Sequence, residues 1–145
     1  MALSQVTDTG NGATLTFSST TFAVALKKIN GFEETIDRLD VSSLATTTYR
    51  DYMPGDLKDA PEVVVDFYWD TGKDMPTLGG AAETITITYP VRTNGGEASG
   101  ATYAGTGFIK SIKFPDLENG AVQMGSMTIC FNGGTGPAFT KAVAA

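Results

Sequence analysis

The sequence predicts a mainly β protein, an antiparallel β-sandwich or barrel formed by a single domain over residues 1–145. Three observations support this fold class. Short runs of β-forming residues alternate between apolar and polar positions, a pattern that places one face of each strand on a core. All five asparagines precede glycine, and Asn-Gly is the strongest short signal for a hairpin turn. Helix signals are weak, so we expect helices to contribute little.

The first two expected strands, residues 13–18 and 22–29, are short and amphipathic. In the first, Leu15 and Phe17 alternate with threonines, and in the second apolar side chains recur at alternate positions from Phe22. Period-2 alternation of this kind is typical of strands that have one face on a core and one face in solvent.

The connector that follows, about residues 35–60, has no clear helix or strand of its own. Most connections in compact domains are about 4–6 residues long, and much longer ones are usually functional or disordered. This one is too apolar for a disordered linker. Its large apolar residues are Ile36, Leu39, Val41, Leu44, Tyr49 and Tyr52. We therefore expect a long strand-connecting loop that packs against something outside the domain, most naturally a neighbouring subunit.

The strand after the connector, residues 61–70, has the clearest alternation in the chain. Apolar side chains at alternate positions from Val63 to Trp69 fall on the face that we expect to meet the core. Glu62 and Asp66 fall on the opposite face, which is typical of a solvated strand surface.

One short helix is expected next, at Asp74–Leu78, with Asp74 as its N-cap and Gly79 at its end. A strand over residues 83–91 then places Ile85 and Ile87 on one face. The opposite face carries three threonines, Thr84, Thr86 and Thr88.

The last two expected strands, residues 106–114 and 121–131, flank a turn at Asn119-Gly120. Beyond them, about residues 133–145 are rich in glycine and small residues. We expect this C-terminal tail to be flexible in a monomer and to become ordered against neighbours.

Net charge is −6, and the acidity is concentrated in one segment. Residues 33–74 contain eleven acids and four bases, a balance of −7, whereas the rest of the chain has five acids and six bases, a balance of +1. Such a field disfavours ordinary binding to the phosphates of nucleic acids. It suits a basic surface, which another copy of the same chain can provide.

Compartment signals are few. There is no run of about 18 apolar residues, and the N-terminal residues lack the basic and apolar regions of a signal peptide, so we expect no membrane span and no leader. Cys130 is the single cysteine, which excludes an internal disulfide and favours assembly in a reducing cytoplasm.

The residue types that most catalysis needs are missing or badly spaced. There is no histidine, which removes histidine-activated nucleophiles and histidine-ligated zinc. Glu62 and Asp66 are about 13 Å apart along a strand, beyond the roughly 5–10 Å of a glycosidase pair. Asp56–Asp59 lacks the pattern of a calcium loop and is expected to be a turn. We expect no enzyme, no catalytic residue, no metal and no cofactor.

An aromatic run, Phe67-Tyr68-Trp69, raises the possibility of a sugar platform, as in a carbohydrate-binding or adhesion module. Strand alternation separates Tyr68 from the other two rings, which favours a core position for Phe67 and Trp69.

Three segments together resemble the major tail protein, or tail tube protein, of long non-contractile-tailed bacteriophages. They are Glu34–Leu44, Tyr49–Ala60 and the strand Pro61–Asp70. In that family a run of the form (I/V)D-x-(T/S)-(S/D)-L precedes a turn of the form R-x-(F/Y)-x-P-G-(L/D)-x-D and an apolar strand. Here the first element is stretched to IDRLDVSSL, and the second reads RDYMPGDLKD. Ile85–Pro90 and Gly105–Ile109 occupy similar places, so the resemblance covers about two thirds of the chain.

The resemblance implies a structural protein that assembles with itself. Subunits of this family form hexameric rings through a sheet that continues between protomers as an inner β-barrel, and stacked rings form a tube that conducts DNA during ejection. The long connector would reach an adjacent ring. The residues implied in inter-ring or inter-subunit contacts are Ile36, Asp37, Leu39, Asp40, Leu44, Tyr49, Arg50, Asp51, Tyr52 and Asp56.

A lumen through which DNA slides should not grip phosphates, so an acidic or threonine-rich wall suits it. Two strand faces qualify, and the sequence does not choose between them. They carry Glu62 with Asp66, and Thr84 with Thr86 and Thr88.

Further implied partners are other tail proteins at the tube ends and a tape-measure protein in the lumen. DNA would pass transiently and non-specifically, and no membrane is involved. The implied location is the virion tail, after assembly in the host cytoplasm.

Two alternatives stay open. One is the carbohydrate-binding or adhesion module. The other is a relative of the same architecture, a tail terminator or a secretion-tube protein. Open-ended stacking of rings distinguishes a tube protein from a terminator.

Overall fold

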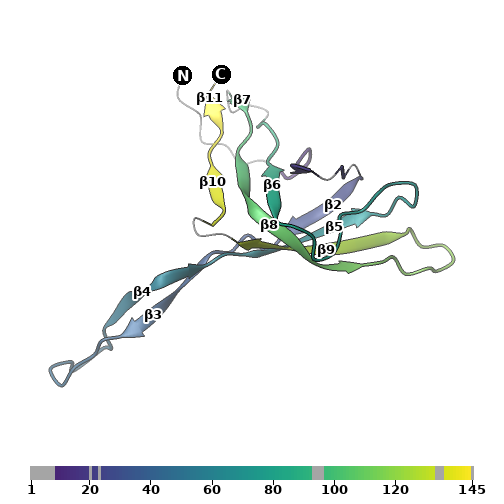
Figure 1. The fold of residues 1–145 in the computed structure, drawn as a ribbon. Coiled ribbons are helices and arrows are strands. Elements are labelled where there is room, and N and C mark those ends of the chain that lie inside the picture. The colour runs from purple at the N-terminus through teal and green to yellow at the C-terminus, as the bar shows by residue number, and fades with distance from the viewer. Residues whose placement is uncertain (1–8, 20, 23, 93–96, 133–135, 145) are drawn as a thin grey trace.

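The computed structural model describes residues 9–144 except residues 20, 23, 93–96 and 133–135 (Figure 1). Within these residues the protein is all β, with antiparallel pairing throughout, which confirms the predicted mainly β class. None of the described segments forms a helix of the length and apolarity that a membrane crossing requires.

The main sheet has seven strands, in the order β1-β6-β8-β9-β5-β2, and β10 pairs with β8. These strands are β1 (Thr14–Phe17), β2 (Leu26–Asn30), β5 (Glu62–Tyr68), β6 (Glu83–Thr88), β8 (Thr102–Lys113), β9 (Met124–Asn132) and β10 (Ala138–Thr140). Two smaller sheets each have two strands. They pair β3 (Thr35–Asp40) with β4 (Tyr52–Asp59) and β7 (Glu97–Ser99) with β11 (Val143–Ala144).

The main sheet bends around the core, and the long strand β8 joins its two halves (Figure 1). Its first part pairs with β6 and its second part with β9, with a register shift between Ile109 and Ser111. Such irregularities bend a strand and increase its twist. Buried apolar side chains from both halves form one cluster: Leu15, Val63, Val65, Phe67, Ile85, Ile87, Tyr103, Ile109, Met127, Ile129 and Phe131. The alternation predicted for β5 and β6 is thus confirmed.

Aromatic packing extends this core at one end. Phe67 is fully buried, its ring packs edge-on against Phe22, and it stacks on Trp69 with ring centroids 5.6 Å apart. Trp69 in turn contacts Phe114. Tyr68 points to the other face and is 40% exposed. This arrangement supports the core position of Phe67 and Trp69 and removes the coplanar exposed rings that a sugar platform needs.

The segment expected as a loop over about residues 35–60 is a β-hairpin, so the prediction of a strandless connector was wrong. β3 and β4 pair with each other and project from the body of the molecule (Figure 1). No apolar alternation signals these strands because neither has a face on the core, and every residue of both except Gly55 is exposed. Pro54 and Gly55 are also weak strand formers. Asp56–Asp59, expected as a turn, belongs to β4.

The short helix expected at Asp74–Leu78 does not form. Met75 precedes a proline, which biases it away from the helical region. The N–H of Gly79 donates to the carbonyl of Ile109 at 3.1 Å, so the segment is tied to β8 rather than to itself. Part of the expected C-terminal tail also pairs within the chain, since β10 lies on β8 and β11 on β7.

Gly31 lies where the chain leaves β2 for the hairpin, and we predict that Gly31→Ala is strongly destabilising. Its φ is +97°, and an added Cβ would lie 2.3 Å from the carbonyl oxygen of Glu62. Gly120 is a matched control, with φ +82° and nothing within 4 Å of its added Cβ. We expect Gly120→Ala to cost about 1–2 kcal/mol of unfolding free energy, and Gly31→Ala to cost at least about 1 kcal/mol more, because the β5 backbone must move. Urea unfolding measures both, and equal losses would contradict the clash.

Candidate assembly surfaces

The hairpin Thr35–Asp59, hereafter the arm, extends from the body with little support from it. Among the described elements, β3 and β4 pack substantially only on each other. A lone two-stranded hairpin is marginally stable in water. The arm therefore leaves most of its surface open to solvent.

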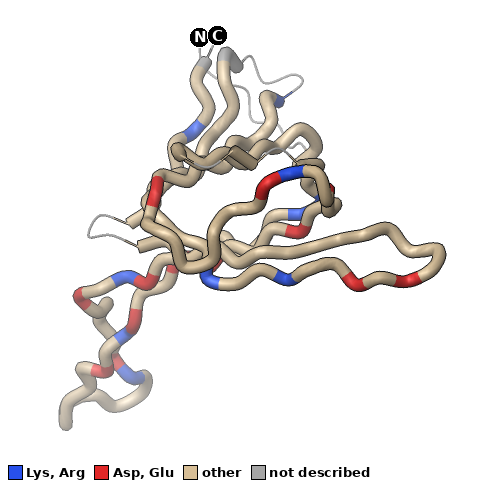
Figure 2. Tube along the Cα trace, turned by 45° about the vertical axis from the view of Figure 1, so that its right-hand side comes forward, with Lys and Arg blue, Asp and Glu red and all other residues tan. Residues whose placement is uncertain are grey.

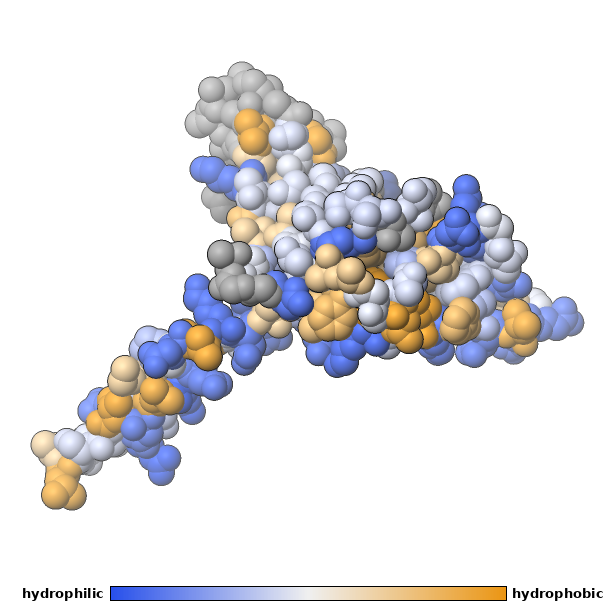
Figure 3. Space-filling view, viewed as in Figure 1, coloured by the Kyte–Doolittle hydropathy of each residue, from blue (hydrophilic) through white to orange (hydrophobic). Residues whose placement is uncertain are grey.

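The two faces of the arm differ in chemistry. Directly paired residues share a face, so Leu39 and Met53 lie together on one side, each a little under half exposed. On the other side the guanidinium of Arg38 lies 4.1 Å from the ring centre of Tyr52, which is a cation–π contact. Apolar surface is visible along the arm and at its tip in Figure 3. The tip presents Leu44 and Tyr49 with almost no cover.

Acidic side chains shape the tip as well as charging it. The N–H of Ser42 donates to Oδ1 of Asp40 at 2.9 Å, and the N–H of Asp51 donates to Oγ of Ser42 at 2.9 Å. The Thr46 hydroxyl donates to Oδ2 of Asp51 at 3.3 Å. The backbone hydrogen bond from Ser42, and then its side-chain hydrogen bond, hold the pKa of Asp40 below its ordinary value. The sequence predicts Asp40 and Asp51 as contact residues, which stays a prediction, and the structure shows both in hydrogen bonds within the tip.

Charge alternates along the arm but is acidic in total. The arm, residues 35–59, contains five acids and three bases, a balance of −2. Figure 2 shows both signs distributed along the projecting hairpin. The arm therefore carries two of the seven net negative charges counted for residues 33–74.

The root of the arm is anchored on the core. Phe32 packs its ring against Tyr103 and Tyr89, with centroids 5.3 and 6.0 Å apart. Burial, and after it the neighbouring Glu34 carboxylate, raises the pKa of Tyr103 to about 12. The aromatic contacts hold the segment between β2 and β3 in place.

A groove lies beside this root, between the two end strands of the main sheet. It has a volume of about 520 Å³ and is lined by β2, by the turn before β1 and by β6. Its apolar lining is Leu26, Ile29, Phe32, Ile87 and Tyr89, and its basic lining is Lys27 and Lys28. At the other end of the same seam Phe22 fills the space between Phe17 and Phe67.

The two strand faces that the sequence offers as lumen walls belong to one face of the main sheet, the face opposite to the core. The pairing leads from Thr84 on β6 through Thr106 on β8 to Asn132 on β9. It leads from Glu62 on β5 to Cys130, two positions from Asn132 and on the same face. The remaining predicted residues, Asp66, Thr86 and Thr88, share this outer face by alternation.

One of the cations on this outer face, Lys110, is paired with a carboxylate. Nζ of Lys110 donates to Oε1 of Glu62 at 2.8 Å and to Oε2 at 3.0 Å, and both side chains are about half exposed. The hydrogen bond with Glu62, and then the charge of its carboxylate, raise the pKa of Lys110. Lys28 on β2 lies opposite Asp66 on β5. The outer face therefore has threonines at one end and opposed charges at the other.

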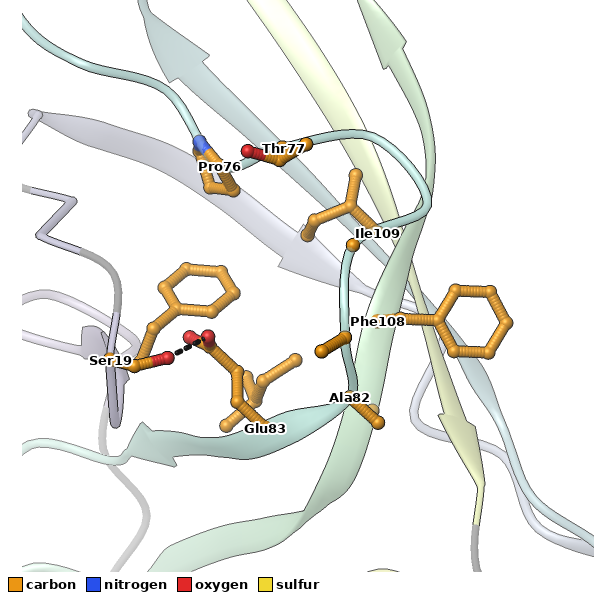
Figure 4. Close-up of a pocket in the computed structure, with 12 residues that line it drawn as sticks. Ser19, Pro76, Thr77, Ala82, Glu83, Phe108 and Ile109 are labelled. Atoms are coloured by element: carbon orange, nitrogen blue, oxygen red, sulfur yellow. Dashed lines mark hydrogen bonds between the residues drawn. The ribbon is translucent and has the colours of Figure 1, made fainter.

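A second hollow, of about 310 Å³, lies under the loop before β6 (Figure 4). The Ser19 hydroxyl donates to Oε2 of Glu83 inside it, and Pro76, Phe108 and Ile109 line it. A single carboxylate bound to a serine hydroxyl provides neither an acid–base pair nor a nucleophile with a base. No set of three metal-ligating side chains occurs among the described residues. This hollow does not support catalysis.

Sequence reasoning missed several members of these surfaces. Met53 and Leu57 join the apolar side of the arm, and Lys27 and Lys28 line the groove. The lysine doublet just before Asn30-Gly31 was a readable signal. The position of these lysines beside a groove could not be predicted, because only the strand order shows that β2 lies at an end of the sheet.

No family model and no curated protein matches the sequence. Solved structures do match the fold. The chain is similar to the tube terminating cap of the anti-feeding prophage, at 14% identity over 98% of this chain and 95% of that chain, with a TM-score of 0.70. It is similar to the sheath/tube terminator of the extracellular contractile injection system PVC, at 12% identity over 94% and 98%, with a TM-score of 0.72. A chain of the PVC sheath-tube complex matches at 11% identity over 89% and 88%, with a TM-score of 0.66.

The chain therefore has a fold that occurs in tube-terminating components of contractile injection systems. The sequence resemblance indicated tubes of non-contractile tails, whereas the matched structures come from contractile particles. At these identities the likeness concerns the fold alone.

Proposed function

We propose that this chain is a structural subunit at the end of a phage-tail-like tube, a tube terminator that forms a ring with copies of itself. The observation that carries this proposal is the match to two terminators over nearly the full length of both chains. The alternative of a tail terminator, open in the sequence, thus becomes the main proposal, and the tube subunit becomes the second.

The sheet supplies a means of ring formation. Within the described residues, β1 pairs only with β6 and β2 only with β5, so each leaves one edge of the main sheet unpaired. Unpaired edges invite strand addition, and joining unlike edges head to tail forms a ring when the rotation between copies closes. Six copies would give the hexameric ring and continuous inner barrel that the sequence resemblance implies.

The arm supplies a contact to another subunit or to the next ring. It is acidic, carries apolar side chains on its surface and extends beyond the body (Figures 1 and 3). The contact residues proposed from sequence, from Ile36 to Asp56, all lie on it.

The outer face of the sheet suits a lumen wall. Its threonines carry no charge, Lys110 pairs with Glu62, and Lys28 and Lys113 lie on either side of Asp66 in the strand pairing, so the acids of this face partly offset its lysines and weaken its hold on phosphates. We propose that DNA passes this wall without specific contacts, that other tail proteins and a tape-measure protein are neighbours, and that the protein resides in the tail of the particle.

Negative-stain electron microscopy of the purified protein over a range of concentrations tests this proposal. We expect closed rings, singly or in short stacks, because a terminator ends a tube rather than extending it. Open-ended tubes would favour the tube-subunit alternative. The match to a chain of the sheath-tube complex supports that alternative. Monomers alone at high concentration would contradict both.

A further inference from the structure

The groove beside β2 leaves apolar side chains partly exposed to solvent. Its floor is apolar, with Leu26, Ile29 and Phe32 on one side and Ile87 and Tyr89 on the other. At the other end of the seam the chain covers the corresponding space itself with Phe22. The strand beside the groove, β2, also has an edge that pairs with no described strand.

The charge at the groove indicates what it can receive. Lys27 and Lys28 are exposed and line it, and Lys28 faces Asp66 across the β2–β5 pair. An occupant that combines apolar side chains with acidic ones would satisfy both the floor and the rim.

The arm has this combination. It exposes Leu39, Leu44 and Tyr49, and it carries a net charge of −2. Its own groove is out of its reach, because the arm leaves from Phe32 at the groove and points away from the body (Figure 1). The occupant must then come from another molecule.

We infer that the groove lined by β2 and Tyr89 receives the arm of a second copy of this chain, with Lys27 and Lys28 opposite the arm's carboxylates. This inference rests on the proposed function and names the two surfaces that meet between neighbouring copies. Because arm and groove are different surfaces, the contact is head to tail and passes from each copy to the next.

Mixed cysteine cross-linking in the full chain tests the inference. In a Cys130→Ser background, Tyr49→Cys places one thiol at the arm tip and Lys27→Cys places one at the groove. The two variants, one carrying a size tag, are mixed and oxidised. We expect a mixed disulfide dimer on a non-reducing gel. Thr84→Cys is the matched acceptor control, because Thr84 is exposed on the outer face, away from the groove. It should give at least about tenfold less mixed disulfide dimer with Tyr49→Cys than Lys27→Cys gives.

Charge exchange is the second test. Lys27→Glu with Lys28→Glu should raise the concentration needed for half-assembly about tenfold, and so should Asp37→Lys with Asp56→Lys. Mixing the two double variants should restore the groove–arm contact between unlike copies. At high salt, the half-assembly concentrations of the double variants should move closer to that of the natural chain. Circular dichroism melts report whether each variant is folded.

Rings that form without any Tyr49–Lys27 cross-link and without charge rescue would overturn the groove inference and leave the proposed function standing. Failure of the unmodified chain to assemble at all would overturn both.

Discussion

Removal of the arm is expected to abolish assembly and to leave the domain folded. Thr35 and Asp59 are directly paired, so residues 36–58 can be replaced by an Asn-Gly turn that closes a two-residue hairpin. The arm contributes nothing to the buried core, so the melting temperature should fall by only a few degrees. Rings and stacks should disappear, because the surface proposed to join copies is gone.

Size-exclusion chromatography, electron microscopy and a thermal melt together measure this outcome. An arm with Leu44→Ser and Tyr49→Ser is the control that keeps the backbone and removes tip apolar surface, and it should assemble more weakly than the natural chain. Rings that survive excision would show that edge pairing of β1 and β2 holds copies together without the arm. Unfolding on excision would place the arm within the monomer's stabilising structure.

Phe67→Ala is expected to be among the most destabilising single truncations in the chain. The side chain is fully buried, packs edge-on against Phe22 and stacks on Trp69. Truncation of a buried phenylalanine costs about 3–5 kcal/mol, a large part of a typical total stability of about 5–15 kcal/mol. The melting temperature should fall by roughly 10–15 °C in a domain of this size.

The neighbouring residue provides the control. Tyr68 lies on the same strand but on the outer face and is 40% exposed. Tyr68→Ala should cost no more than about 1 kcal/mol of unfolding free energy in urea. Equal losses for the two variants would mean that β5 does not present the face seen here to the core.

The turns and the amphipathic strands could be predicted from the sequence. Glycines of three Asn-Gly pairs, Gly12, Gly31 and Gly120, have positive φ as that dipeptide predicts. Asn94-Gly95 and Gly133 lie outside the described residues. β5 and β6 were predicted from period-2 alternation because one face of each meets the core.

The arm and the loop after β5 could not be predicted in the same way. A strand without a buried face leaves no alternation, so β3 and β4 look like a loop in sequence although their apolar content was visible. The helix signal at Asp74–Leu78 was local, and a hydrogen bond from Gly79 to β8 opposed it. The assembly roles of Ile36, Leu39, Leu44 and Tyr49 stay predictions, although the structure shows all four exposed.

The β class, the core face of the central strands and the acidic, apolar character of residues 35–60 follow from the sequence alone. These are properties of local alternation and composition, and they do not depend on which strands pair. Three features emerge only in the folded chain: this segment is a hairpin, the two candidate lumen faces belong to one sheet face, and a lysine-lined groove opens beside β2. Each depends on pairing between residues distant in sequence, and pairing is set by the shared core and not by any single segment.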